Sequence, residues 1–274
     1  MNRSGLTQKT ALLQERIAEL GSVVVAFSGG VDSTLLLAMC LEVLGRDDVL
    51  AVTVESAIHP SVERGRAAEL ASQLRARHRV IGFDALSDPD FCANSPQRCF
   101  FCKRGIMGLM RAIADEEGLA HIVHGANVDD MGDFRPGMRA AIEAGARAPL
   151  QDASLTKADI RTLSKEMGLP TWDVPSMACL ASRFPYGTPL TEEALARVDA
   201  AENFMRQTFG IRQLRVRDHR PIARIEVPEV DFPALISPDA RIRIVEKFKE
   251  LGYTYVALDL AGFRSGSLNE VLQS

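Results

Sequence analysis

A short apolar strand, a glycine turn and an apolar helix follow one another near the start of this 274-residue chain. The apolar run 23–27 leads into Ser28-Gly29-Gly30-Val31-Asp32-Ser33, and a helical pattern covers 31–44. Two glycines allow the backbone to curve closely around an anion, and the first N–H groups of a helix point toward it. The segment therefore predicts a phosphate-binding loop between a buried strand and a helix.

The polar side chains of this loop suit a nucleotide held together with a metal ion. Ser28 and Ser33 supply hydroxyl donors, and Asp32 supplies a carboxylate of the kind that binds Mg²⁺. The loop has no Gly-Lys-Ser/Thr and is not a Walker A loop, and it also differs from GxGxxG. The alternative is a tight turn with a helix cap and no ligand.

Apolar β-branched runs alternate with helical patterns over the first two thirds of the chain. Strands are expected at 23–27, 49–54, 79–83 and 121–124, and helices at 31–44, 60–76, 99–117 and 156–167. This order predicts the α/β class, with a doubly wound, mostly parallel sheet.

Prolines and glycines replace the periodic pattern over 170–191, which indicates a long crossing segment that is either functional or a linker. Beyond it, helices are expected at 192–208 and 238–250, and strands at 213–217, 222–227 and 253–258. We therefore predict a larger domain over 1–178 and a smaller C-terminal α+β domain over 179–274.

Composition narrows the range of functions. A net charge of -4 gives no basic field, so a nucleic-acid partner is not expected. No apolar run approaches the roughly 18 residues that span a bilayer, and the N-terminus lacks the apolar region of a signal peptide. A cytoplasmic location without membrane association is expected. The five cysteines then indicate thiols, metal ligands or reactive groups more than disulfides.

A second polar segment, Gly125-Ala126-Asn127-Val128-Asp129-Asp130, follows the expected strand 121–124. Because doubly wound sheets bind ligands at the carboxyl ends of their strands, this segment should face the same crevice as the glycine loop. Asn127 and Asp130 could hold ribose, metal or substrate, with Gly125 beside them. The motif DFRPG follows at 133–137.

The glycine loop resembles the SGGxDS signature of the PP-loop superfamily. The superfamily resemblance implies an adenine nucleotide α-hydrolase-like fold and cleavage of ATP to AMP and pyrophosphate. Ser28, Gly29, Gly30, Asp32 and Ser33 would hold the pyrophosphate, with Mg²⁺ on Asp32.

Four further motifs narrow the resemblance to the LarE family of ATP-dependent sacrificial sulfur transferases. They are CLASRFPYG at 179–187, RVRDH at 215–219, ARIE at 223–226 and DLAGFRSGSLN at 259–269. The resemblance covers nearly the whole chain. It implies sulfur transfer to an adenylated carboxylate of pyridinium-3,5-biscarboxylic acid mononucleotide in nickel-pincer cofactor assembly. It also implies a homo-oligomer, with a hexamer as one form.

Cys179 stands where the family has its sulfur-donating cysteine. The resemblance implies that this thiol attacks the adenylated carboxylate and that its Cβ–S bond then breaks, which leaves dehydroalanine. Arg183 would favour the thiolate electrostatically, and it is also expected to contact a bound ligand. The alternative for Cys179 is a small buried apolar residue.

Two arginines and one glutamate complete the predicted site. Arg215 and Arg217 stand two apart on an expected strand, project on one face and suit phosphate oxygens. A solvated edge strand is their alternative. Glu226 is expected either to bind metal or to pair with Arg224.

Other functions remain open at the level of the sequence. Cys99 and Cys102, in a CxxC pattern, could join Cys179 in holding a [4Fe–4S] cluster that carries the sulfur. The chain could also be a PP-loop amidating synthetase, a tRNA thiolase or a nucleotide-binding module without catalysis. Cys40 is expected to be structural.

Overall fold

The computed structural model describes residues 3–132, 136–175, 178–264 and 266–272. Its contacts separate two compact units. The first comprises 1–56, 63–84 and 97–177, and the second comprises 57–62, 85–96 and 178–274. Two short stretches from the first half of the chain therefore belong to the second unit. The division into domains 1–178 and 179–274 stays a prediction.

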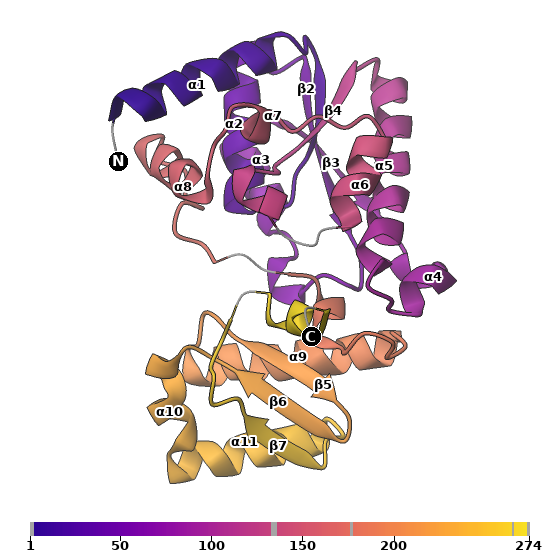
Figure 1. The fold of residues 1–274 in the computed structure, drawn as a ribbon, viewed down its shortest axis with the longest axis vertical. Helices are drawn as coiled ribbons and strands as arrows, with labels where there is room; N and C mark the ends of the chain where they lie inside the picture. Colours follow the sequence, from indigo (N-terminus) through magenta and orange to yellow (C-terminus); the bar gives the residue numbers. More distant parts are fainter. Residues whose placement is uncertain (1–2, 133–135, 176–177, 265, 273–274) are drawn as a thin grey trace. The chain divides into compact units, whose positions relative to one another are not determined.

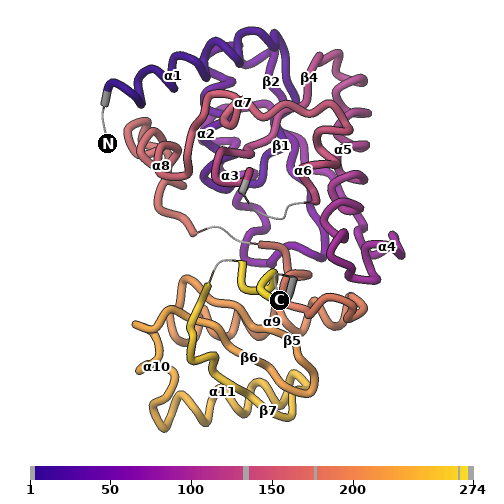
Figure 2. The backbone as a smooth tube through the Cα atoms, viewed as in Figure 1, coloured from indigo at the N-terminus to yellow at the C-terminus, as the bar shows by residue number. Residues whose placement is uncertain are grey.

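The first unit is built on a four-stranded parallel sheet, as the alternating pattern predicted. The strands are β1 (Val23–Ala26), β2 (Val49–Glu55), β3 (Arg77–Gly82) and β4 (His121–His124). Their order is β3-β2-β1-β4, so the chain fills one side of β1 before β4 pairs with the other side (Figure 2). Ala26 is in register with His124. The residues after β1 and after β4 therefore leave the sheet at the same edge.

Helices cover both faces of this sheet, which confirms the doubly wound α/β class (Figure 1). One face carries α1 (Arg3–Ala18), α2 (Val31–Leu44), α3 (Arg66–Gln73), α7 (Pro149–Asp152) and α8 (Lys157–Glu166). The other face carries α5 (Arg98–Glu117) and α6 (Pro136–Glu143). Alternate residues of the buried strands divide between the two cores, because successive side chains of a strand point to opposite faces.

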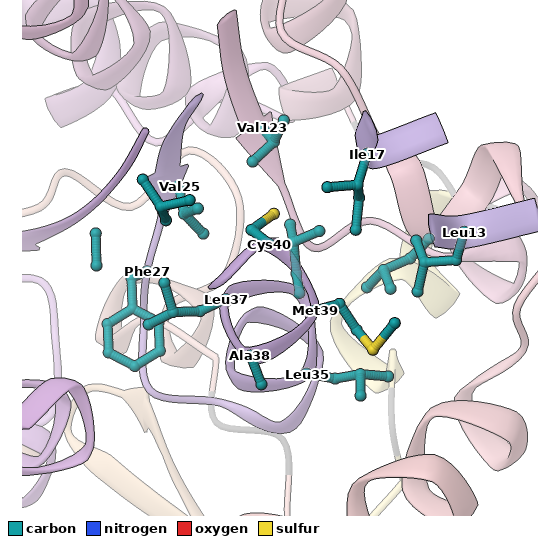
Figure 3. Close-up of a cluster of buried hydrophobic side chains, with 14 of the residues drawn as sticks. Leu13, Ile17, Val25, Phe27, Leu35, Leu37, Ala38, Met39, Cys40 and Val123 are labelled. Atoms are coloured by element: carbon teal, nitrogen blue, oxygen red, sulfur yellow. The ribbon is translucent and has the colours of Figure 1, made fainter. Parts of the chain in front are cut away.

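The core on the α2 face is closely packed and apolar (Figure 3). Leu13 and Ile17 of α1 reach it from one side, and Val25 and Val123 reach it from the sheet. Cys40 lies fully buried among them, and burial raises the pKa of its thiol to about 12. This cysteine is therefore structural, as predicted.

The expected helix over 60–76 is wrong in its first half. The chain instead forms a short 3-10 helix, Ser61–Glu63, and α3 begins at Arg66. Gly65 between them has a φ of 77°, a left-handed conformation that interrupts a helix. Periodicity did not indicate the short helix α4 (Pro89–Cys92) or α6, α7 and α10 (Phe232–Ile236).

The second unit combines a small mixed sheet with helices. Its elements are α9 (Glu192–Phe209), β5 (Arg215–His219), β6 (Ile222–Glu226), α10, α11 (Pro238–Glu250) and β7 (Tyr255–Leu258). The sheet order is β5-β6-β7, antiparallel between β5 and β6 and parallel between β6 and β7. Its apolar core joins Met205 of α9, Val216 and Ile225 of the sheet, and Phe248 of α11.

Short 3-10 helices complete the two units, at Ala85–Ser87, Val128–Gly132, Leu180–Arg183, Glu229–Asp231 and Ser267–Leu272. None of the helices in the described part of the chain is long and apolar enough to span a membrane.

Candidate active site

The glycine loop lies where the sequence predicted it, between β1 and the first turn of α2. Gly29 has a φ of 71°, and a Cβ atom on it would lie 3.3 Å from the Cα atom of Ala67. The Ser28 and Ser33 hydroxyl oxygens are 3.1 Å apart, and the Ser28 N–H donates to Ser33 Oγ at 3.2 Å. The loop is thus curled upon itself at the positive end of a helix.

The segment after β4 packs directly on this loop. A Cβ atom on Gly125 would lie 3.0 Å from the Ser33 nitrogen and 3.1 Å from Asp32 Cβ, so a larger residue would force the two segments apart by a few tenths of an ångström. Asn127 Nδ2 donates to Asp32 Oδ1 at 3.4 Å, and the Asn127 N–H donates to Asp130 Oδ2 at 3.0 Å. The structure therefore brings the two polar segments of the first unit together.

Sequence reasoning missed one member of this group, Lys157. Its ammonium is in direct contact with the Asp32 carboxylate, and its backbone N–H donates to Asp129 Oδ2 at 2.7 Å. The residue is the first of α8, which Thr156 caps together with Asp159. The one sequence signal that could have pointed to Lys157 was its place in the first turn of a helix, where acidic residues are favoured.

The donors and acceptors of this group fit a nucleotide phosphate with a divalent cation. Helix N–H groups and the Ser28 and Ser33 hydroxyls are donors for phosphate oxygens, and the Asp32 carboxylate is a ligand of the kind that hard cations prefer. Lys157 adds a mobile positive charge. The individual nucleotide and metal contacts stay predictions.

Cys179 lies in the second unit, at the start of the 3-10 helix Leu180–Arg183, and is partly exposed. One Arg183 nitrogen donates to the carbonyl oxygen of Ala178 at 2.7 Å and to that of Cys179 at 3.1 Å. The Leu180 N–H donates to the Ile58 carbonyl oxygen at 2.7 Å. The backbone on both sides of the thiol is therefore held in place.

Arg183 is balanced by a buried carboxylate. It forms two hydrogen bonds to Glu202 of α9, at 2.8 and 3.0 Å, and both side chains are buried. Burial alone would raise the pKa of Glu202, but the charges and hydrogen bonds of Arg183 and Arg206 outweigh it and lower that pKa. The geometry gives Arg183 a positioning role for the Cys179 segment, whereas its predicted contact with a ligand is untested.

Arg217 and Glu226 form a second buried pair, across β5 and β6. Two guanidinium nitrogens donate to the two carboxylate oxygens at 2.9 and 2.8 Å. Arg224 donates to Glu226 at 3.0 Å, so the predicted pairing of these two residues is present. Because Arg217, Arg224 and the Ser267 hydroxyl all contact Glu226, a metal ion there would have to displace them. The role of Glu226 as a metal ligand stays a prediction.

Arg215 differs from Arg183 and Arg217 because no carboxylate pairs with it in the described residues. Its side chain is only 9% exposed and lies over the ring of Phe263, 4.9 Å from the ring centre. Burial, together with the charges of Arg183 and Arg217, lowers the pKa of Arg215 to about 10. The guanidinium is therefore still charged at neutral pH, and an anion would give it the direct partner that the nearby charges of Glu226 and Glu202 do not provide. The solvated-edge alternative is wrong for Arg215 and Arg217, since both are buried.

The other cysteines that the sequence offered as metal or cluster ligands are divided between the two units. Cys99 and Cys102 lie in the first two turns of α5, in the first unit, and Cys92 lies in the second. Within the described ranges, no three His, Cys, Asp or Glu side chains are grouped to hold a metal ion. Residues 133–135 of the DFRPG motif and Ser265 lie outside the described residues.

The parallel sheet and its glycine loop define an adenine-nucleotide-binding protein of the PP-loop class. A family model described as NAD synthase matches residues 6–88. Argininosuccinate synthase of Halobacterium salinarum is 30% identical over 148 residues, which cover 50% of this chain and 37% of that protein. ATP with a divalent metal ion is general to this class.

Two relatives match along the whole chain. The pyridinium-3,5-bisthiocarboxylic acid mononucleotide synthase of Lactiplantibacillus plantarum is 42% identical over 270 residues, which are 97% of this chain and 96% of that protein. An uncharacterized protein of Synechocystis is 37% identical over 97% of this chain and 99% of its own length. The chain belongs to the LarE family, of which that synthase is a member.

Proposed function

We propose that this protein transfers sulfur to a carboxylate of pyridinium-3,5-biscarboxylic acid mononucleotide, with ATP as the activating substrate. The name of the synthase that it resembles specifies a bisthiocarboxylic acid mononucleotide as product. Sulfur in that product replaces carboxylate oxygen, which must first become a leaving group. The observation that carries the proposal is the presence, in one chain, of a PP-loop in the first unit and of a partly exposed cysteine, Cys179, on a fixed backbone segment of the second.

The first unit supports the activation step. The substrate carboxylate attacks the α-phosphate of ATP, pyrophosphate leaves and an acyl adenylate forms. Helix N–H groups and the Ser28 and Ser33 hydroxyls stabilise the charge that develops on the departing pyrophosphate. We propose Mg²⁺ as the divalent ion, held by Asp32; its contribution is to neutralise phosphate charge.

Cys179 supports the sulfur step. Its thiolate attacks the acyl carbon, a thioester forms and AMP leaves. Removal of the Cys179 α-proton then breaks the Cβ–S bond, so that the electron pair goes to sulfur, a thiocarboxylate is released and dehydroalanine remains in the chain. One chain thus supplies one sulfur atom. Arg183 assists by holding the backbone carbonyl groups of Ala178 and Cys179.

We assign the mononucleotide phosphate to Arg215. It is a buried guanidinium to which no described carboxylate is paired, whereas Arg217 is held by Glu226. A phosphate dianion at Arg215 would form charge-assisted hydrogen bonds of the strongest kind available to a side chain. Arg217 then acts mainly by fixing the position of β5.

Intact-protein mass spectrometry before and after incubation with ATP, Mg²⁺ and the pyridinium dicarboxylate mononucleotide tests this function. We expect the protein to lose the mass of one H₂S, mapped to Cys179. The variant Cys179→Ser should keep its mass and form no thiolated product. The matched control Cys92→Ser removes another partly exposed thiol and should behave like the unaltered protein.

The other outcomes separate the alternatives. Thiolated product with an unchanged protein mass, lost in Cys99→Ser and accompanied by bound iron, would favour a cluster as the sulfur carrier. Turnover that survives Cys179→Ser would favour an amidating synthetase. Salt-dependent binding of tRNA would favour a thiolase, and ATP binding without pyrophosphate release would favour a non-catalytic module. The cytoplasmic location and the homo-oligomer stay predictions.

A further inference from the structure

We propose that Asp199 of α9 is a positioning residue for the sulfur step. It holds the stretch 57–62, and the Ile58 carbonyl oxygen in that stretch holds the backbone N–H that follows Cys179. This inference rests on the proposed function, because it assigns a role in the transfer of sulfur from Cys179. The residue lies outside the glycine loop and outside the buried arginine pairs.

The peptide group that joins Cys179 to Leu180 is held at both of its ends. Its carbonyl oxygen, which belongs to Cys179, accepts from Arg183 at 3.1 Å and from the Ser182 N–H at 3.0 Å. Its N–H, which belongs to Leu180, donates to the Ile58 carbonyl oxygen at 2.7 Å. A shift of the Ile58 carbonyl group would therefore turn this peptide group and move the cysteine next to it.

The stretch 57–62 is held in the second unit although the chain on both sides of it belongs to the first. It lies between β2, which ends at Glu55, and α3, which begins at Arg66. Ile58 is buried. Because the neighbouring chain on either side belongs to another unit, the place of Ile58 beside Leu180 depends on contacts that the second unit itself supplies.

Two side chains of α9 supply such contacts. Asp199 and Asn203 stand four residues apart and so lie on one face of the helix. Asp199 Oδ1 accepts from the Ser61 N–H at 3.0 Å, and Asn203 Nδ2 donates to Ser61 Oγ at 2.7 Å. Asn203 Nδ2 also donates to Asp199 Oδ2 at 3.2 Å, which orients the carboxylate. Ser61 is thereby fixed through both its backbone and its side chain.

The same helix reaches the carbonyl end of the peptide group by a separate route. Glu202 of α9 accepts two hydrogen bonds from Arg183, which donates to the Cys179 carbonyl oxygen. A substitution of Asp199 disturbs the route through the N–H and leaves this one intact. Because misplacing a reacting group by about 1 Å can slow a reaction about a hundredfold, the partial loss of one route should slow the step that uses the thiol.

Asp199→Ala removes the acceptor for the Ser61 N–H and should loosen the contact between Ile58 and Leu180. In hydrogen exchange measured by mass spectrometry on the full chain, the Leu180 amide should exchange about five- to tenfold faster, the effect of losing one hydrogen bond. In a single turnover, pyrophosphate release should keep its rate, because adenylation does not use Cys179. The loss of H₂S from the protein should become about tenfold slower.

Two matched variants separate positioning from a general structural effect. Asp199→Asn keeps an oxygen that can accept from the Ser61 N–H, so the exchange rate and the rate of H₂S loss should stay within about twofold of those of the unaltered protein. Gln207→Ala, at an exposed position of the same helix, should change neither rate. Circular dichroism of each variant checks that the fold is kept.

Three results would contradict the role of Asp199. They are an unchanged exchange rate of the Leu180 amide in Asp199→Ala, faster exchange with an unchanged rate of H₂S loss, and a parallel fall in pyrophosphate release, which would indicate general damage. The proposed function fails in a different way. If the unaltered protein releases pyrophosphate and forms no dehydroalanine, the sulfur step itself is overturned, and with it the role of Asp199 in that step.

Discussion

At the scale of single residues, three of the buried arginines of the second unit differ in how their charges are balanced. Glu202 accepts two hydrogen bonds from Arg183, and Glu226 accepts two from Arg217. Arg215, on the same face of β5 as Arg217, has an aromatic ring beside it but no carboxylate among the described residues. Removing a partner of a buried pair and removing an isolated buried charge have opposite consequences for stability.

Arg215→Leu and Arg217→Leu should therefore separate binding from stability. Arg217→Leu leaves Glu226 without its two-bond partner and should lower the free energy of unfolding by about 3 kcal/mol. Arg215→Leu removes an unpaired buried charge, so stability should stay within about 1 kcal/mol or rise. It should also weaken binding of the mononucleotide about ten- to a hundredfold.

Urea unfolding and calorimetric titration with the mononucleotide measure these two quantities. Arg212→Gln, at an exposed position before β5, is the matched control and should alter neither. Equal loss of stability in the two leucine variants, with mononucleotide binding kept in Arg215→Leu, would contradict the assignment of the phosphate to Arg215.

At the scale of elements, the site of the first unit depends on how closely β4 approaches α2. Ala26 and His124 are in register on neighbouring strands, so both strands deliver their following residues to one edge of the sheet. Gly125 is the contact point, since a Cβ atom there would lie 3.0 Å from the Ser33 nitrogen. The Ser33 N–H belongs to the first turn of α2, which is the part that we propose to bind phosphate.

Gly125→Ala should consequently weaken ATP binding by about tenfold or more, because the added methyl group pushes the segment after β4 away from the start of α2. Calorimetric titration of the variant with ATP and Mg²⁺ measures the effect. Gly108→Ala is the control, since its added Cβ meets no atom within 4 Å in the exposed part of helix α5. That control should bind ATP normally and be slightly more stable; unchanged binding in Gly125→Ala would show that the close approach is not needed.

At the scale of the whole molecule, the second unit is assembled from three separate stretches of chain. One large apolar cluster of this unit lies within residues 201–258, but the segment after Cys179 is held by residues from the first half of the chain. Asn94 Nδ2 donates to the Pro185 and Thr188 carbonyl oxygens at 2.8 and 2.9 Å. The Asn94 carbonyl accepts from the Gly187 N–H at 3.0 Å.

A fragment of residues 178–274 should thus keep its folded core and lose order around 179–190. Hydrogen exchange measured by mass spectrometry should show core amides, such as those of α9, protected as in the full chain. The amides of Leu180, Gly187 and Leu190 should exchange rapidly, because their acceptors in Ile58, Asn94 and Cys92 are absent. Equal protection of these three amides in the fragment and the full chain would contradict this dependence.

The sequence by itself determined the features that arise from local chemistry. Apolar β-branched runs, the helical period and the Ser28–Ser33 loop specified the parallel sheet, the doubly wound order and the glycine loop at the start of α2, because each depends on residues within one element and its turn. Motifs along the chain specified the LarE family. The break at Gly65 escaped periodicity because glycine can continue a helical pattern or end it.

Only the tertiary structure decided which charges are free and which are paired. Lys157 and Asp32 are 125 residues apart, and Arg183 meets Glu202 across two elements, so no local pattern could join them. The sequence pattern does not distinguish Arg215 from Arg217. In the structure, a carboxylate on the neighbouring strand pairs with Arg217 and not with Arg215. The physical reason is that the interaction energy of a charged side chain depends on its burial and its partners, and the packing of distant segments determines both.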